Sequence, residues 1–154
     1  MSKSIVLTGQ DFITLGQDTV RVLQNLGDGD IGHITFSDNH ADMTVGKDGT
    51  AIIARNQKGR KGELVIRVLR GSDDDIFIGL MLSDYLNDSI GFFCINGSVT
   101  KQLGDGVGNY SFVTYELSAG TIMKTPEVTA NVGGNTDQAI SVYTIQGIVD
   151  QVFE

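Results

Sequence analysis

Apolar and polar residues alternate along much of the chain, which predicts β-strands. The segment Glu63–Arg70 shows this most clearly, since Leu64, Ile66 and Val68 share one face of an extended backbone. The stretch Tyr110–Lys124 is rich in Phe, Val, Thr and Tyr, which favour strands. Further strands are expected at Ile5–Leu7, Phe12–Leu15, Val20–Leu23, Ile31–Phe36, Thr50–Ala54, Phe92–Thr100 and Ile140–Phe153.

Glycine-rich turns separate these segments. Lys47–Gly49 and Gly104–Gly106 each combine Asp and Gly, the residue types that tight turns select. The second of them, extended to Gly108, predicts the loop of a long hairpin. The chain has 20 glycines and one proline, which fits many tight turns between strands.

One helix is expected, at about residues 73–87. Ser72 and Asp75 have the spacing of a capping box, with Asp in place of Glu. Three aspartates, at 73–75, then lie where the positive end of the helix dipole favours carboxylates. The sequence therefore predicts a mainly β fold, an antiparallel sandwich or split barrel with one flanking α-helix, in a single domain over residues 1–154.

Composition narrows the functional classes. The chain has 154 residues, of which 40% are hydrophobic and 19% charged, and this excludes a disordered polyampholyte or a coiled coil. A net charge of -8 makes a nucleic-acid-gripping domain a poor candidate. The apolar stretches are too short to cross a bilayer, so we expect no membrane insertion. The start of the chain lacks a signal-peptide pattern, so we expect synthesis in a cytoplasm.

Charge is unevenly distributed along the chain. Residues 1–48 carry a net charge of -4, residues 49–70 carry +5 and residues 71–154 carry -9. A basic segment within an acidic chain can pair with an acidic surface on a neighbouring copy. It can equally be a solvated loop, and charge alone leaves both interpretations open.

Motifs for catalysis or cofactor binding are weak. Gly27–Gly32 spells G-x-G-x-x-G, but a strand-like run follows it where a dinucleotide site needs a helix. His33 and the group Asp38, His40 and Asp42 do not show the spacing of a metal site. Cys94 has Phe92, Phe93 and Ile95 as neighbours and is expected to be a small buried hydrophobe. No catalytic residue, cofactor or metal is predicted.

In sequence, the chain resembles the tail tube proteins of contractile-tailed bacteriophages. The segments that carry the resemblance occur in order over most of the chain, and consist of strand and turn sequence. They are Asn25–Asp30, Val45–Ile52, Glu63–Asp75, Gly97–Gly106 and Asp137–Tyr143.

The resemblance implies a structural virion protein without catalytic residues. Tail tube proteins form hexameric rings that stack into a hollow tube inside a contractile sheath, and DNA is ejected through it. The implied partners are further copies, tail sheath, tape measure and baseplate proteins, and double-stranded DNA in passage. The implied location is the virion tail, after synthesis in the host bacterial cytoplasm.

In this family, a long hairpin or loop comparable to residues 37–62 reaches the next ring. The residues expected to make inter-subunit contacts are Lys47, Arg55, Lys58, Arg60, Lys61, Asp73, Asp74, Asp75 and Asp84. An acidic lumen would let DNA slide, because it cannot bind phosphates by releasing counterions. The carboxylates proposed to line it are Asp28, Asp30, Asp105 and Glu116.

Alternatives remain within and outside this class. The type VI secretion tube protein, haemolysin co-regulated protein, shares the architecture, and a tube-initiating baseplate subunit would do so as well. A small-ligand-binding β-barrel would instead need a large apolar cavity and would stay monomeric. An enzyme is the third class, and thiol labelling of Cys94 is its simplest test.

Overall fold

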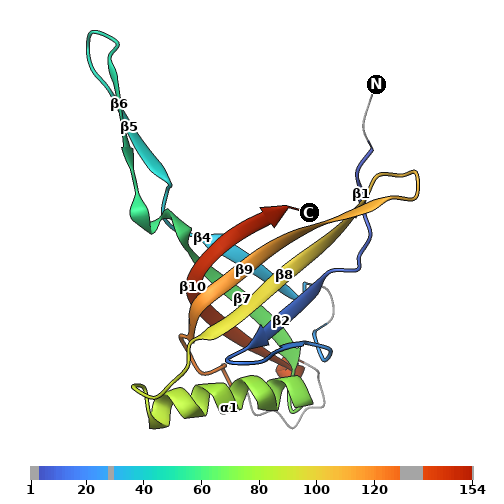
Figure 1. The fold of residues 1–154 in the computed structure, drawn as a ribbon. Coiled ribbons are helices and arrows are strands. Elements are labelled where there is room, and N and C mark those ends of the chain that lie inside the picture. Colours follow the sequence, from blue (N-terminus) through green and yellow to red (C-terminus); the bar gives the residue numbers. More distant parts are fainter. Residues whose placement is uncertain (1–3, 28–29, 129–136, 154) are drawn as a thin grey trace.

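The computed structural model describes residues 4–27, 30–128 and 137–153 (Figure 1). It consists of an eight-stranded antiparallel sheet, a separate two-stranded hairpin and one α-helix. The elements, in chain order, are β1 (Val6–Leu7), β2 (Phe12–Gly16), β3 (Val20–Val22), β4 (Gly32–Phe36), β5 (Ala41–Val45), β6 (Ala51–Arg55), the 3-10 turn η1 (Gln57–Arg60), β7 (Lys61–Leu69), α1 (Asp73–Asn87), β8 (Ile95–Gly104), β9 (Tyr110–Ile122), the 3-10 turn η2 (Asp137–Ala139) and β10 (Ile140–Phe153).

The large sheet has the strand order β3-β2-β8-β9-β10-β7-β4, with β1 paired to the far end of β8. The long β8–β9 hairpin and β10 form its centre, and β3 and β4 are its two ends. The sheet curls so that β4 approaches β2: a Cβ placed on Gly32 of β4 would lie 3.0 Å from Cδ1 of Ile13 in β2. The sheet is therefore a barrel that remains open, as the predicted split barrel with one helix requires.

The core lies between the concave side of the sheet and α1. Alternate residues of β2, β7 and β10 point into it, so the predicted inward face of Leu64, Ile66 and Val68 is confirmed, with all three fully buried. The helix contributes Ile78 and Met81. In Figure 1 the helix runs across one end of the sheet, opposite the end where β5 and β6 project.

The predicted helix of residues 73–87 is confirmed at both ends. Ser72 is the N-cap, and its hydroxyl accepts a hydrogen bond from the amide of Asp75 at 3.3 Å. The second half of the predicted capping box differs, because the Asp75 carboxylate accepts from the amide of Gly71, at 2.8 Å, rather than from that of Ser72. The Asp75 side chain thus bonds one residue further back than in a capping box. It still provides an acceptor for a backbone N–H that precedes the first turn of the helix.

Two predictions need correction. The first concerns Ala41–Val45, which was not expected as a strand and forms β5. The second concerns Cys94, which is exposed and not buried. The strand expected from Phe92 begins instead at Ile95, which takes the fully buried position, so Cys94 is left in the loop that follows α1.

Candidate assembly surfaces

The hairpin of residues 41–55, called the arm below, projects from the body of the molecule (Figure 1). In the part of the chain that the structure describes, its strands β5 and β6 pair only with each other. The turn at its tip closes with hydrogen bonds from the Gly49 amide to the Gly46 carbonyl, at 3.0 Å, and from the Gly46 amide to the Thr50 carbonyl, at 2.8 Å. Gly49 has a φ of +88°, the left-handed conformation that this turn requires.

The Asp48 carboxylate stabilises the same turn. It accepts hydrogen bonds from the amide and the hydroxyl of Thr50, each at 3.0 Å. The hydrogen bond from the Thr50 amide, and then the one from the Thr50 hydroxyl, lower the pKa of Asp48 below its usual value. Asp48 therefore forms its hydrogen bonds within the turn, whereas the neighbouring Lys47 is exposed to solvent.

Every residue of the arm is exposed, yet one of its faces is apolar. The register pairs Ala41 with Arg55, Met43 with Ile53, and Val45 with Ala51, so these six side chains share one face. Met43, Val45 and Ile53 are each about 60% exposed, at 62%, 60% and 64%. A two-stranded hairpin is at best marginally stable in water, so such a face indicates a partner.

The base of the arm is held to the sheet. The Asn56 amide donates to the His40 carbonyl at 2.8 Å, which brings the two ends of the arm together. Arg60 forms a two-pronged ion pair with Asp150 of β10, with Nε–Oδ1 at 2.9 Å and Nη2–Oδ2 at 2.6 Å. This pair raises the pKa of Arg60 further above its usual value. Of the five bases expected to contact a neighbouring subunit, Arg60 therefore has a partner within its own chain.

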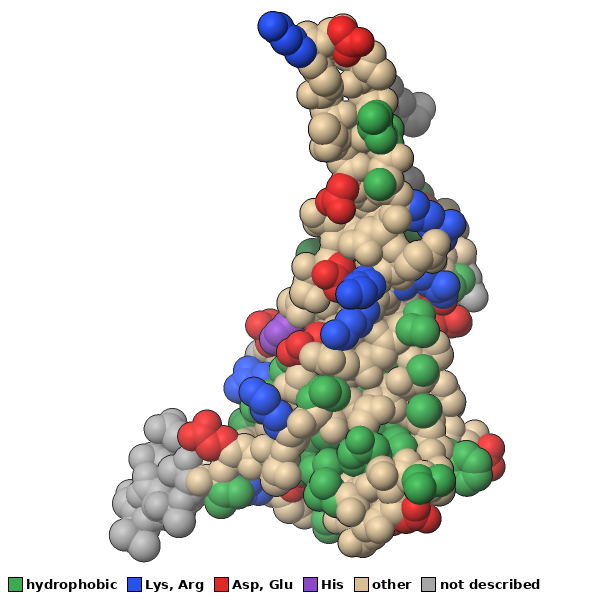
Figure 2. Space-filling view, turned by 90° about the vertical axis from the view of Figure 1, so that its left-hand side faces the viewer, with side chains coloured by type: hydrophobic (Ala, Val, Ile, Leu, Met, Phe, Trp, Pro, Cys, Tyr) green, Lys and Arg blue, Asp and Glu red, His purple; other side chains and the backbone are tan. Residues whose placement is uncertain are grey.

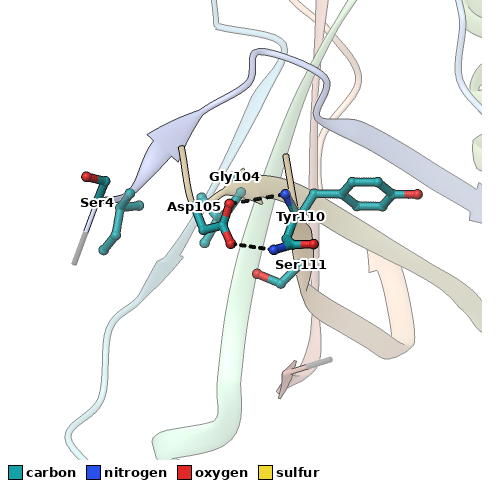
Figure 3. Close-up of a pocket in the computed structure, with 8 residues that line it drawn as sticks. Ser4, Gly104, Asp105, Tyr110 and Ser111 are labelled. Atoms are coloured by element: carbon teal, nitrogen blue, oxygen red, sulfur yellow. Dashed lines mark hydrogen bonds between the residues drawn. The ribbon is translucent and has the colours of Figure 1, made fainter. Parts of the chain in front are cut away.

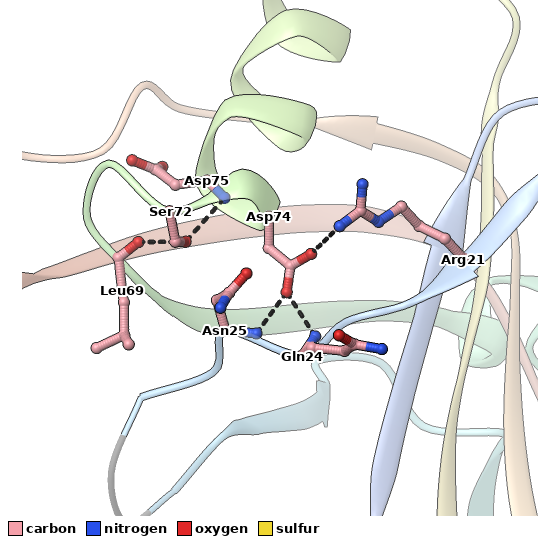
Figure 4. Close-up of polar contacts among 7 residues, drawn as sticks. All are labelled: Arg21, Gln24, Asn25, Leu69, Ser72, Asp74 and Asp75. Atoms are coloured by element: carbon pink, nitrogen blue, oxygen red, sulfur yellow. Dashed lines mark hydrogen bonds and ion pairs between the residues drawn. The ribbon is translucent and has the colours of Figure 1, made fainter.

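The three aspartates that begin α1 differ in their surroundings, and Figure 4 shows those of Asp74 and Asp75. Asp74 is fully buried and accepts from the amides of Gln24 and Asn25, at 2.5 and 2.6 Å, and from Nη2 of Arg21, at 2.6 Å. The Arg21 guanidinium also lies over the ring of Phe77, 4.9 Å from its centroid. This is a correction to the expected contact set, because a side chain enclosed by its own subunit cannot contact another.

Asp75 is also engaged within the subunit. Its Oδ1 accepts a 2.6 Å hydrogen bond from the hydroxyl of Tyr143, in β10, and this joins the helix to the sheet. Asp73 and Asp84, in contrast, are exposed on the outer side of α1. Of the four aspartates of α1 that were expected to contact a neighbouring subunit, Asp73 and Asp84 are therefore the two exposed on the outer side of the helix.

A polar row crosses the convex side of the sheet. Along one row of the register, Thr14 of β2 lies beside Ser98, Ser98 beside Glu116, and Glu116 beside Asp150. Hydroxyls bond across the strands here, with 2.7 Å between the oxygens of Thr14 and Ser98. Glu116 is exposed on this face, and its place in a lumen stays a prediction.

Asp30 and Asp105, also proposed to line the lumen, lie elsewhere. Asp30 is exposed in the loop before β4, and Asp28 falls outside the described residues. Asp105 lies in the β8–β9 turn, where it accepts from the amide of Val107, at 2.9 Å. It also accepts from both nitrogens of Asn109, as Figure 3 shows. The Val107 amide and then the Asn109 side chain lower the pKa of Asp105. Asp105 thus orders the turn, next to a surface hollow of about 300 Å³.

A second hollow, of about 330 Å³, lies where the split barrel is open. It is lined mainly by apolar side chains of β4, β8 and β9, and the ion pair between Lys101 and Asp11, at 2.9 Å, crosses its rim. Within the described ranges, no three His, Cys, Asp or Glu side chains are grouped as metal ligands would be. None of the helices described is long and apolar enough to span a bilayer.

Comparison with known proteins gives a structural match without a sequence match. No protein-family model and no curated protein matches the chain. Its structure is similar to a chain in the cryo-EM structure of the anti-feeding prophage (AFP) baseplate, which was six-fold symmetrised. The TM-score is 0.54 at 12% sequence identity, and the alignment covers 100% of this chain and 97% of the other. At that identity, the two chains share the fold.

Proposed function

We propose that this protein is a structural subunit that assembles into stacked hexameric rings, forming the inner tail tube of a contractile tail through which DNA is ejected. The observation that carries the proposal is the arm, which has an apolar face and no buried residue. A segment of this kind gains its stability from a neighbouring copy. The fold shared with a prophage baseplate chain supports the same class of assembly.

The ends of the sheet offer a way to close a ring. Among the described residues, strands β3 and β4 are each paired on one side only, and Val20 and Val22 of β3 are about half exposed. Unpaired edges invite pairing with another chain, and a rotation that closes turns such a contact into a ring. In the proposed ring, β3 of one subunit lies beside β4 of the next, and the convex face with Glu116 lines the lumen.

The lumen face suits the passage of DNA. Its central row carries hydroxyls and carboxylates, and Arg60 is paired with Asp150, which belongs to this row. The carboxylates of the row repel phosphates, so the row does not hold DNA by counterion release. Lys61 and Arg67, in β7, are cations on the same face outside this row. Sheath, tape measure and baseplate proteins are the further partners in this proposal.

Removal of the arm tests the proposal. Because the Asn56 amide already bonds to the His40 carbonyl, residues 41–55 can be replaced by Asn-Gly, which closes tight hairpins. We expect the wild-type protein to form tubes in negative-stain images at high concentration. The shortened variant should keep its circular dichroism spectrum and remain unassembled. A wild-type protein that stays monomeric at every concentration and salt would refute the proposal.

A tube-initiating baseplate subunit is the second candidate, because the chain that shares this fold belongs to a baseplate. The two candidates differ in the length of the assembly. A tube subunit adds further rings without limit, whereas an initiating subunit stops after one or two. Purified protein that forms single rings and no longer tubes would favour the baseplate role.

A further inference from the structure

The apolar face of the arm is bounded by two cations. Arg55 lies at the base, directly across from Ala41, and Lys47 lies in the turn at the tip. Lys47 lies six positions beyond Ala41, so the two charges are at most about 20 Å apart along the arm. Between them lie Met43, Val45 and Ile53, all exposed.

The outer side of α1 carries the complementary arrangement. Asp73, Ile76, Leu80 and Asp84 follow the i, i+3, i+7, i+11 spacing, which places them on one stripe of a helix. All four are exposed, Ile76 at 54% and Leu80 at 60%. The stripe thus has an acid at each end and two large apolar side chains between them. Eleven residues of helix give it a length of about 16 Å.

The arm and this stripe match in length, charge and apolar character. The long side chain of Lys47 covers the small difference in length, and α1 contains no Lys or Arg that would repel it. Within one subunit they cannot meet, because the arm and α1 lie at opposite ends of the sheet (Figure 1). Figure 2 shows the same separation, with Lys and Arg side chains on and below the arm and hydrophobic side chains gathered at the far end.

We propose that the stripe Asp73–Ile76–Leu80–Asp84 of α1 receives the apolar face of the arm from the next copy of this chain. This inference rests on the proposed function and names the surface that the arm binds. The contact joins two different surfaces, so it repeats from one copy to the next and extends the stack when the rotation between copies does not close. The apolar side chains exclude water, and the two ion pairs fix the direction and register of the arm on the helix.

Charge reversal and its rescue test the inference. Asp84→Lys places a cation in the last turn of α1, where the helix dipole favours it, so the variant is expected to fold. We expect the concentration needed for assembly, measured by sedimentation, to rise about tenfold or more, which corresponds to at least about 1.4 kcal/mol per contact. Adding Lys47→Asp or Arg55→Asp should restore assembly, and the one that does so reveals the direction of the arm.

Lys58→Asp is the matched control, since Lys58 is an exposed base that lies outside the arm and its apolar face. It should not rescue Asp84→Lys. If Asp84→Lys assembles like the wild type, or if neither arm variant restores assembly, the inference is wrong while tube formation by the wild type still supports the proposed function. If the wild type never assembles, both fail.

Discussion

The body and the arm of this protein are stabilised in different ways. In the body, Leu64, Ile66 and Ile78 are fully buried between the sheet and α1. In the arm, no side chain is buried, and its backbone bonds only to itself and at its base. The body therefore has a core of its own, whereas the arm has none. Mutations should separate these two sources of stability.

The largest effect is expected from the core. Leu64→Ala removes buried methyl groups and leaves a cavity, which should lower the free energy of unfolding by about 2–5 kcal/mol. The matched change in the arm, Ile53→Ala, should alter it by no more than about 0.5 kcal/mol, as for other surface positions. Urea denaturation followed by circular dichroism measures both. Similar losses at the two sites would mean that the arm is part of the folding unit.

Substitution of Asp74 tests how much its hydrogen bonds to the segment before β4 stabilise the body. Asp74→Ala leaves the amides of Gln24 and Asn25 without their acceptor, and a buried unsatisfied donor costs about 1–3 kcal/mol. Asp73→Ala removes an exposed carboxylate at the same end of the helix and is the control. We expect urea denaturation to show a clear loss for the first and little change for the second. Equal losses would point to the helix dipole rather than to these hydrogen bonds.

The raised pKa of Tyr143 leads us to expect that the folded protein loses stability at alkaline pH. Burial, and then the hydrogen bond to Asp75, raise its pKa well above the usual value of 10.0. The folded state therefore holds the proton more tightly than the unfolded state, so stability is fully present below pH 10 and is lost as pH rises above it. Tyr143→Phe should cost about 0.5–1.5 kcal/mol at neutral pH, because Asp75 keeps its bond to the Gly71 amide.

Urea midpoints between pH 8 and pH 12 measure this dependence. The wild-type protein should lose stability more steeply above pH 10 than Tyr143→Phe does. Tyr110→Phe, which changes an exposed ring at the start of β9, should follow the wild type. Parallel curves for the wild type and Tyr143→Phe would show that this hydroxyl is not what alkali affects.

The sequence predicted the helices and strands that are marked by nearby residues, such as a capping residue or a regular spacing of apolar side chains. The helix began and ended where the Ser72 cap and the apolar spacing indicated, and β10 has the bounds that were expected. Strand β5 was missed because its five residues contain only Met43 and Val45 as large apolar side chains, among polar and small neighbours. The alternation was present, but it is shorter than the stretches that indicate a buried strand.

Contacts between residues far apart in the chain could not be predicted from the sequence. Asp74 looked like its neighbours Asp73 and Asp75, and only the fold brings the amide of Gln24 to it across 50 positions. Arg60 likewise appeared as one base in a basic segment, although the sheet places Asp150 beside it. The apolar face of the arm needed the register of β5 and β6, which no periodicity could supply.

The smallest effect on the body is expected from the turn of the arm. Gly49 and Gly71 both have a positive φ, +88° and +80°, and a Cβ at either would meet no atom within 4 Å. Alanine at each position therefore introduces the same backbone strain, about 1–2 kcal/mol. Gly71 precedes α1 within the body, so Gly71→Ala should lower the free energy of unfolding by that amount. Gly49→Ala should leave it unchanged and raise only amide exchange and proteolysis within residues 41–55. A fall in global stability with Gly49→Ala would show that the arm and the body unfold together, and the separation between them would be lost.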